Sequence, residues 1–137
     1  MIDPRPHPAG DSQTVTVLVV DDQEAFRHVV RDLVRATDGF GLVGEAASGE
    51  RALAAVSALC PRMVIVDRRM PGMSGIDVAR RLSEEHPGVV VVLVSAEEPD
   101  AKLQRSCGAA AFVSKQQLSA RLLQAVWREH SSERMRL

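Results

Sequence analysis

Carboxylates, a hydroxyl group and a lysine follow the apolar segments of this sequence in a regular order. Asp21 and Asp22 come directly after VTVLVV, and Asp67 comes directly after MVIV. Further along, Ser95 follows VVVVLV, and Lys115 follows AAAFVS. Three carboxylates brought close together repel one another unless a cation joins them, so they predict a divalent metal ion with oxygen ligands. Mg²⁺ fits best, because it uses one or two carboxylates and keeps several waters.

These residue types suit the acceptance of a phosphoryl group. A carboxylate supplies the nucleophile, a metal ion and an ammonium group neutralise the phosphoryl oxygens, and a hydroxyl group donates a hydrogen bond. A single aspartate at the end of a strand is usually a helix cap, and an isolated acidic pair is usually only solvated. The joint occurrence of all these groups, each after a different apolar segment, favours the functional interpretation.

The elements that must position these residues are short apolar strands alternating with helices. Strands are expected at residues 15–20, 41–46, 63–66, 89–94 and 109–113. Three of them are apolar without alternation, as strands covered on both faces must be. Helices are expected at about residues 26–35, 48–59, 74–86, 99–107 and 117–129. This alternation predicts a doubly wound α/β domain with a parallel sheet, in which chemistry takes place at the carboxyl ends of the strands.

Helical spacing indicates which residues of the first two helices face inward. Apolar residues recur at intervals of three and four, with charged residues between them. The residues expected to be buried are Phe26, Val29, Val30, Leu33 and Val34 in the first helix, and Leu53, Val56 and Leu59 in the second.

The helix ends also carry recognisable signals. Ser48 and Ser74 are the expected N-caps of the second and third helices, and Asp77 stands three residues after Ser74, which is the spacing of a capping box. Pro99 suits the first turn of the fourth helix, and Gly108 suits its C-terminal stop.

Length and composition restrict the class of protein. The chain has 137 residues, enough for one domain with its own core. Its 17 basic and 18 acidic residues give a net charge of −1, so direct DNA binding is not expected. The longest apolar run, residues 89–94, is too short to span a membrane, and no signal peptide precedes it, which predicts a cytoplasmic protein. Cys60 and Cys107 lie far apart and are expected to be small buried hydrophobic residues.

The expected organisation is a single folded unit between two terminal segments. Residues 1–13 are rich in Pro, Asp and Gly and predict a disordered arm. The folded domain is expected over residues 14–130, followed by a frayed tail over residues 131–137.

The motifs VLVVDD, VIVDRRMPGMSG, VVVLVSA and AAFVSK resemble those of one family, the receiver domains of bacterial two-component response regulators. The resemblance covers about residues 15–130 and is closest to the receivers that are often joined to helix-turn-helix effectors. It implies a flavodoxin-like fold with five strands in the order 2-1-3-4-5 and five helices. Too little sequence follows Lys115 for a DNA-binding domain, so we expect a receiver without an effector, either on its own or as a fragment.

The resemblance also implies roles for individual residues. Asp67 would be the phosphoacceptor, which takes a phosphoryl group from a sensor histidine kinase. Asp22 would bind Mg²⁺ directly, Asp21 would act mainly through water, and the backbone carbonyl of Arg69 would supply a third protein ligand. Lys115 would pair with the phosphoryl oxygens.

A switch is implied at two further positions. Ser95 would turn toward the phosphoryl group, and Phe112 would swing inward as it does so, changing the surface of the fourth helix, fifth strand and fifth helix for a downstream protein. No enzymatic activity is expected beyond Mg²⁺-dependent self-phosphorylation and slow autodephosphorylation. Whether phosphorylation produces a homodimer stays open.

The sequence departs from the family pattern near two of these residues. Gln116 stands where many receivers have a proline with a cis bond, so a cis bond is not expected after Lys115. Arg69 and Glu97 lie two positions after Asp67 and Ser95, and we hypothesise that they pair and slow hydrolysis of the acyl phosphate. An exposed pair that contributes little is the alternative. The sequence alone indicates no role for Arg68.

Other functions compete with this interpretation. A phosphatase that uses an aspartyl phosphate would normally have a second acid where Arg69 stands. A nucleotide-binding domain would have a glycine-rich phosphate loop, whereas the first turn reads DDQEAF. An interaction module that keeps the receiver fold and works without phosphorylation remains the main alternative.

Overall fold

The structure, a computed structural model, describes residues 14–135. The expected N-terminal arm, residues 1–13, lies outside the described residues, as do residues 136–137 of the expected tail. The five strands are β1 (Val15–Val20), β2 (Phe40–Ala46), β3 (Met63–Asp67), β4 (Val90–Ser95) and β5 (Ala111–Ser114). Each bound falls within two residues of the predicted one.

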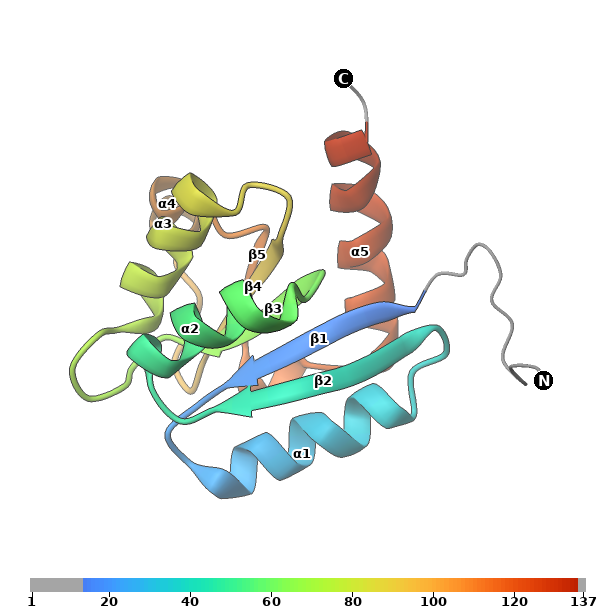
Figure 1. The fold of residues 1–137 in the computed structure, drawn as a ribbon, viewed down its shortest axis with the longest axis horizontal. Helices are drawn as coiled ribbons and strands as arrows, with labels where there is room; N and C mark the ends of the chain where they lie inside the picture. The colour runs from blue at the N-terminus through green and yellow to red at the C-terminus, as the bar shows by residue number, and fades with distance from the viewer. Residues whose placement is uncertain (1–13, 136–137) are drawn as a thin grey trace.

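The strands form one parallel sheet in the order β2-β1-β3-β4-β5 (Figure 1). This confirms the predicted doubly wound topology. In the register, Asp67 of β3 lies opposite Val94 of β4, and Ser95 lies opposite Ser114 of β5. The chain reverses its direction of travel across the sheet between β1 and β3, so a crevice is expected outside the carboxyl ends of these two strands.

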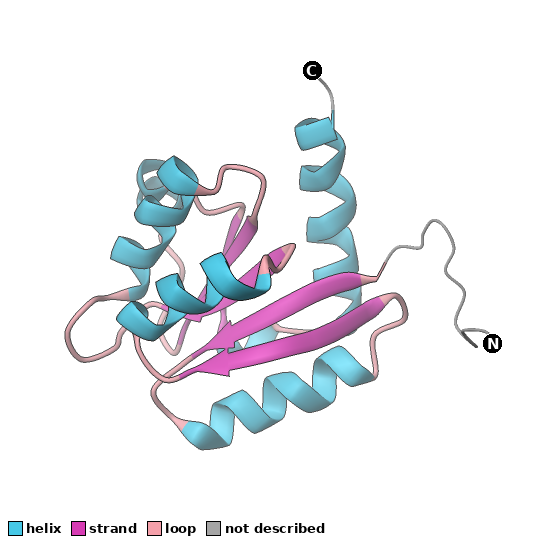
Figure 2. Ribbon diagram, viewed as in Figure 1, coloured by secondary structure: helices cyan, strands magenta, loops and turns pink. Residues whose placement is uncertain are grey.

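Five α-helices cover the two faces of the sheet (Figure 2). They are α1 (Glu24–Arg35), α2 (Gly49–Leu59), α3 (Gly75–Glu85), α4 (Ala101–Cys107) and α5 (Ala120–Met135). Helices α2, α3 and α4 pack on one face, and α1 and α5 pack on the other. Among the described residues, no helix is both long enough and apolar enough to cross a membrane.

The core consists of two apolar layers that share the strands. Val20, Val64 and Leu93 point toward α2, α3 and α4, whereas Val19 and Ile65 point toward α1 and α5. Strands buried on both faces need this continuous run of apolar residues, which explains why the sequence showed no alternation. The sheet is therefore a rigid base for the residues that follow its strands.

The predicted capping signals hold for α2 and α3, whereas for α4 only the C-terminal signal holds. The Ser48 hydroxyl accepts a hydrogen bond from the Arg51 N–H, and Ser74 and Asp77 form the predicted capping box. Gly108 ends α4 in the left-handed conformation, as expected. Pro99 lies outside α4, because Asp100 is the N-cap and its carboxylate accepts hydrogen bonds from two backbone N–H groups.

The end of the chain also differs from the expectation. A short 3-10 turn at Lys115–Gln117 precedes α5, which begins three residues later than predicted and continues to Met135. The predicted tail from residue 131 is thus helical at its start. An apolar pattern marks only the part of a helix that packs on the core, so it did not reveal this extension.

Three residues that were expected to be buried are exposed. Val29 of α1 is 58% exposed and Leu59 at the end of α2 is 45% exposed. Helix α1 buries Val30 and Val34, and its narrow contact face leaves Val29 in solvent. Cys60 is exposed because it is the C-cap of α2, with a left-handed backbone (φ 51°), whereas Cys107 is buried as predicted.

Gly75 lets the first turn of α3 approach the end of β3. Its N–H donates a hydrogen bond to the carbonyl of Arg68 at 2.9 Å. A Cβ atom at this position would collide with the backbone carbonyl of Asp67. The close approach therefore fixes the backbone that carries Asp67.

We predict that Gly75→Ala lowers the free energy of unfolding by about 1–3 kcal/mol, the usual range for forced overpacking. Gly88→Ala is the matched control, since no atom lies within 4 Å of a Cβ added there. Urea denaturation of both variants provides the measurement. Equal stability of the two variants would contradict the proposed contact.

Candidate functional site

Three carboxylates meet at the carboxyl edge of the sheet. Asp67 is the last residue of β3, and Asp21 and Asp22 follow β1 directly. Each offers an oxygen atom, and these three atoms all lie within 4.8 Å of one another. Asp21 is fully buried and Asp67 is 7% exposed, while Asp22 is open to solvent. The predicted cluster of acids is therefore present in space.

Lys115 brings a positive charge to the same cluster. Its ammonium nitrogen lies 2.9 Å from Asp21 Oδ2 and 3.5 Å from Asp67 Oδ1. Although the ammonium group is near, no well-directed hydrogen bond reaches the buried Asp21 Oδ2. One lysine thus faces three acids, and negative charge remains in excess.

The environment of Asp67 changes its protonation. Burial, followed by the negative charge of Asp21, raises the pKa of Asp67 from 3.8 to about 6, and Lys115 offsets part of this rise. Near neutral pH the carboxylate is still mostly ionised. The ionised Asp67 carboxylate can therefore act as a nucleophile. Burial and the neighbouring negative charge destabilise this ionised form as long as no further cation is bound.

The residues present fit a hard divalent cation. The cluster consists only of carboxylate oxygens, which Mg²⁺ prefers, and the buried Asp21 Oδ2 lacks a directed hydrogen-bond donor. Asp22 is exposed, so a hydrated ion can reach the cluster from solvent.

Ser95 lies beside the cluster at the end of β4. It is 2% exposed, and its hydroxyl oxygen accepts a hydrogen bond from the Glu97 N–H at 3.0 Å. A cavity of about 250 Å³ adjoins the site. Its lining residues are Asp22, Gln23, Asp67, Arg69, Ser95, Ala96, Glu97 and Lys115.

Residues 17–127 match the model of the response regulator receiver domain family. The chain belongs to this family. It is 36% identical to the response regulator GacA of Pseudomonas viridiflava over an alignment of 114 residues. This alignment covers 82% of this chain and 53% of GacA. The chain is also 29% identical over 126 residues to the nitrate/nitrite response regulator NarL of Escherichia coli, covering 90% of this chain and 58% of that protein. The chain thus spans about half the length of these relatives.

A solved receiver structure agrees with this assignment. The signal receiver domain of the putative response regulator NarL from Mycobacterium tuberculosis superposes with a TM-score of 0.77 at 32% identity. That comparison covers 85% of this chain and 95% of the other. The family resemblance predicted from the motifs is therefore confirmed.

In this receiver domain, the two arginines after Asp67 have different surroundings. The guanidinium of Arg69 lies 3.1 Å from Glu97 Oε1, so the predicted pair is present, although both side chains are more than half exposed. Arg68 lies with its guanidinium 5.9 Å from the centre of the Phe112 ring and 3.9 Å from the same Glu97 oxygen. Phe112 itself is 6% exposed, so its ring is already inward.

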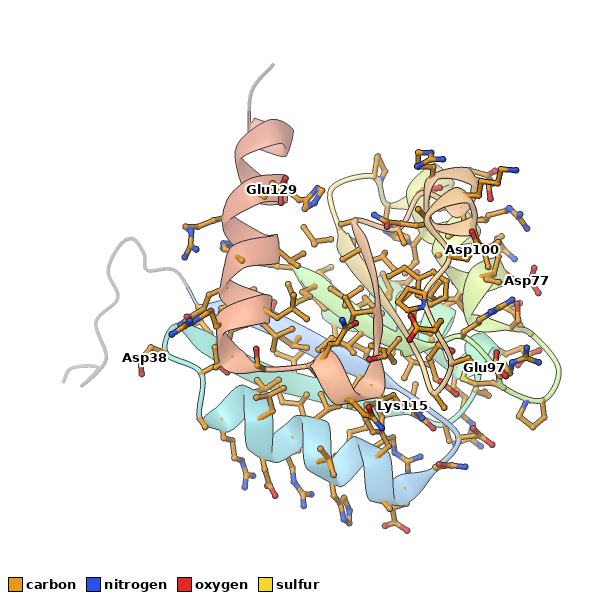
Figure 3. All side chains as sticks on the ribbon, turned by 180° about the vertical axis from the view of Figure 1, so that it is seen from behind. Asp38, Asp77, Glu97, Asp100, Lys115 and Glu129 are labelled. Carbon is orange, nitrogen blue, oxygen red and sulfur yellow. The ribbon has the colours of Figure 1, made fainter. Side chains whose placement is uncertain are left out.

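Figure 3 labels Lys115 and Glu97, which both line the cavity beside the acids. Lys115 follows β5 and lies close to α1, while Glu97 follows β4. The described residues contain no cis peptide bond, so the bond after Lys115 is trans, as expected.

Two residues of α1 make contacts that were missed in the sequence. Arg27 donates a hydrogen bond to the carbonyl of Asp21 at 2.7 Å and pairs with Glu45 at 3.1 Å. The Phe26 ring lies 4.2 Å from the Lys115 ammonium nitrogen. The sequence places Phe26 on the apolar face of the first helix and Arg27 on its charged face, and it assigns neither residue to the site. Both residues lie about one helical turn after Asp21 and Asp22, and this position could have indicated that they reach the acids.

The raised pKa of Asp67 predicts a dependence of stability on pH. Between about pH 4 and pH 6 the folded chain keeps a proton that the unfolded chain releases, so the folded state loses stability as the pH rises through this window. The Asp67→Asn variant has no carboxyl group at this position, so its folded state does not lose stability in this way as the pH rises. Without divalent metal ions, the variant should therefore be more stable than the wild type at pH 7, by about 3 kcal/mol.

This advantage should disappear near pH 4, where the wild-type carboxyl group is protonated in the folded chain. Urea denaturation at both pH values measures it. An advantage of the same size at pH 4 and pH 7 would contradict a raised pKa.

Proposed function

We propose that this receiver domain accepts a phosphoryl group on Asp67 in two-component signal transduction. The observation that supports this most is the meeting of Asp67 with two further carboxylates and Lys115 at one edge of the sheet. The donor would be a phosphohistidine of a sensor histidine kinase. The domain would act in the cytoplasm, with no enzymatic activity beyond its own phosphorylation and slow dephosphorylation.

In the proposed step, a carboxylate oxygen of Asp67 attacks the phosphorus atom of a phosphohistidine whose other ring nitrogen carries a proton. A P–O bond forms, the P–N bond breaks, and its electron pair returns to the ring, which therefore leaves as neutral imidazole. The product is an acyl phosphate. Water later attacks it, releases inorganic phosphate and restores the carboxylate.

The other residues would stabilise the transferred group. Lys115, 3.5 Å from Asp67, would pair with a phosphoryl oxygen, and the Ser95 hydroxyl would donate a hydrogen bond after release from the Glu97 N–H. Asp22, the backbone carbonyl of Arg69 and, through water, Asp21 would hold a magnesium ion. When bound, that ion would supply positive charge to the phosphoryl oxygens.

The switch would use the Ser95 and Phe112 positions. A phosphoryl group favours one arrangement only if its contacts differ between two arrangements. Movement of Ser95 toward the phosphoryl group provides such a difference, and the inward Phe112 ring is compatible with it. The surface of α4, β5 and α5 would then be presented to a downstream protein, with homodimer formation as one possible output. The downstream target would be a protein and not DNA, because the chain carries no excess of positive charge.

The first test uses Mg²⁺ and acetyl phosphate, or beryllium fluoride as the phosphoryl mimic. Intact-protein mass spectrometry should detect one phosphoryl adduct on the wild type in the presence of Mg²⁺ and none on Asp67→Asn. Absence of an adduct on the wild type would favour the interaction module that works without phosphorylation. An adduct that survives the Asp67→Asn change would place the chemistry at another residue.

A second test concerns the lifetime of the acyl phosphate. We expect the Arg69–Glu97 pair to shield it from water, so Arg69→Ala and Glu97→Ala should each shorten the lifetime, by at most about fivefold for an exposed pair. Arg81→Ala is the matched control, because it breaks an exposed pair with Glu85 (2.8 Å) away from the site. An unchanged lifetime in either site variant would refute the shielding role.

A further inference from the structure

We propose that Phe26 is a positioning residue that holds the Lys115 ammonium group over the acidic cluster. This inference rests on the proposed function of Lys115. The ammonium nitrogen lies 4.2 Å from the centre of the Phe26 ring, 2.9 Å from Asp21 Oδ2 and 3.5 Å from Asp67 Oδ1. The ammonium group therefore contacts both the aromatic ring and the two buried carboxylates.

The backbone around Lys115 gives limited support to its side chain. Lys115 follows a strand of four residues and begins a 3-10 turn, with Gln116 in place of a proline. The turn is held by the bond from the Ser114 N–H to Gln117 Oε1 at 2.9 Å and by a long bond of 3.5 Å between Leu118 and Lys115. A lysine has four rotatable bonds, so a fixed backbone would still leave its ammonium free to turn into solvent.

Phe26 can fix this ammonium because α1 is itself tied to the acids. Arg27, its neighbour, donates to the carbonyl of Asp21 at 2.7 Å and pairs with Glu45 of β2. Phe26 packs against the apolar layer between the sheet and the α1 and α5 helices. The ring therefore keeps a fixed distance from Asp21, and its negative face attracts a cation.

The Phe26 ring attracts the Lys115 ammonium group whether or not a metal ion is bound, which the carboxylates cannot do to the same extent. A carboxylate that binds a metal ion loses part of its attraction for the lysine, whereas the attraction of the Phe26 ring does not depend on metal occupancy. The contact would thus keep Lys115 directed toward Asp67 in the state that accepts a phosphoryl group. Leucine would fill much of the same space without this attraction.

The main experiment measures the apparent affinity for beryllium fluoride in the presence of Mg²⁺, with the variants Phe26→Leu and Phe26→Tyr. Phe26→Leu should weaken the affinity about three- to tenfold, the range expected for a partly desolvated cation–ring contact. Phe26→Tyr keeps the ring and should retain the wild-type affinity. Phe40→Leu is the control, because it removes a ring from the same apolar layer at the start of β2. It should leave the affinity unchanged.

A double-mutant cycle without metal or mimic separates positioning from simple packing. Phe26→Leu should lower the urea midpoint more in the wild type than in Lys115→Met, because only the wild type carries the ammonium. Equal shifts in the two backgrounds, or unchanged beryllium fluoride affinity in Phe26→Leu, would overturn the inference. A wild type that binds no beryllium fluoride would refute the proposed function instead, and the cycle would then decide alone whether Phe26 holds Lys115.

Discussion

Repulsion among three carboxylates at one edge of the sheet is the constraint on which the rest of the site depends. Asp21 and Asp67 are buried, and together with Asp22 they face the single ammonium group of Lys115. Burial of Asp67, and after it the negative charge of Asp21, raises the pKa of Asp67. Such an arrangement is unfavourable by itself, and it becomes favourable when further positive charge is added. The three carboxylates are therefore arranged so that an added cation would stabilise them, and the proposed phosphoryl transfer would use that cation.

The fold provides the rigidity that holds these charges together. Each acid follows a strand that is buried on both faces, and the close approach of Gly75 fixes the backbone at Asp67. The cations, by contrast, come from long side chains that depend on neighbouring rings and acids. Phe26 lies beside Lys115, Phe112 lies beside Arg68, and Glu97 faces both arginines. The acids are thus placed by the backbone and the cations by side-chain contacts.

This division also explains what the sequence could predict. Apolar runs predicted every strand, and because parallel strands end at one edge, they predicted the meeting of Asp21, Asp67 and Lys115. Contacts between side chains of different elements follow no period along the chain, so the Phe26–Lys115 and Arg68–Phe112 contacts were missed. The exposure of Val29 and Cys60 was missed for a related reason, since an apolar residue type does not reveal how wide a buried face is.

The most direct test of this account is the effect of Mg²⁺ on thermal unfolding at pH 7. The wild type should gain stability in a saturable way as Mg²⁺ is added, because a ligand that binds only the folded state raises its melting temperature. Asp22→Asn should need far more Mg²⁺ for the same gain, whereas Asp38→Asn, an exposed acid away from the cluster, should behave like the wild type. A wild type that gains nothing from Mg²⁺, or an Asp22→Asn variant that gains equally, would contradict the claim that the three carboxylates form one cation site.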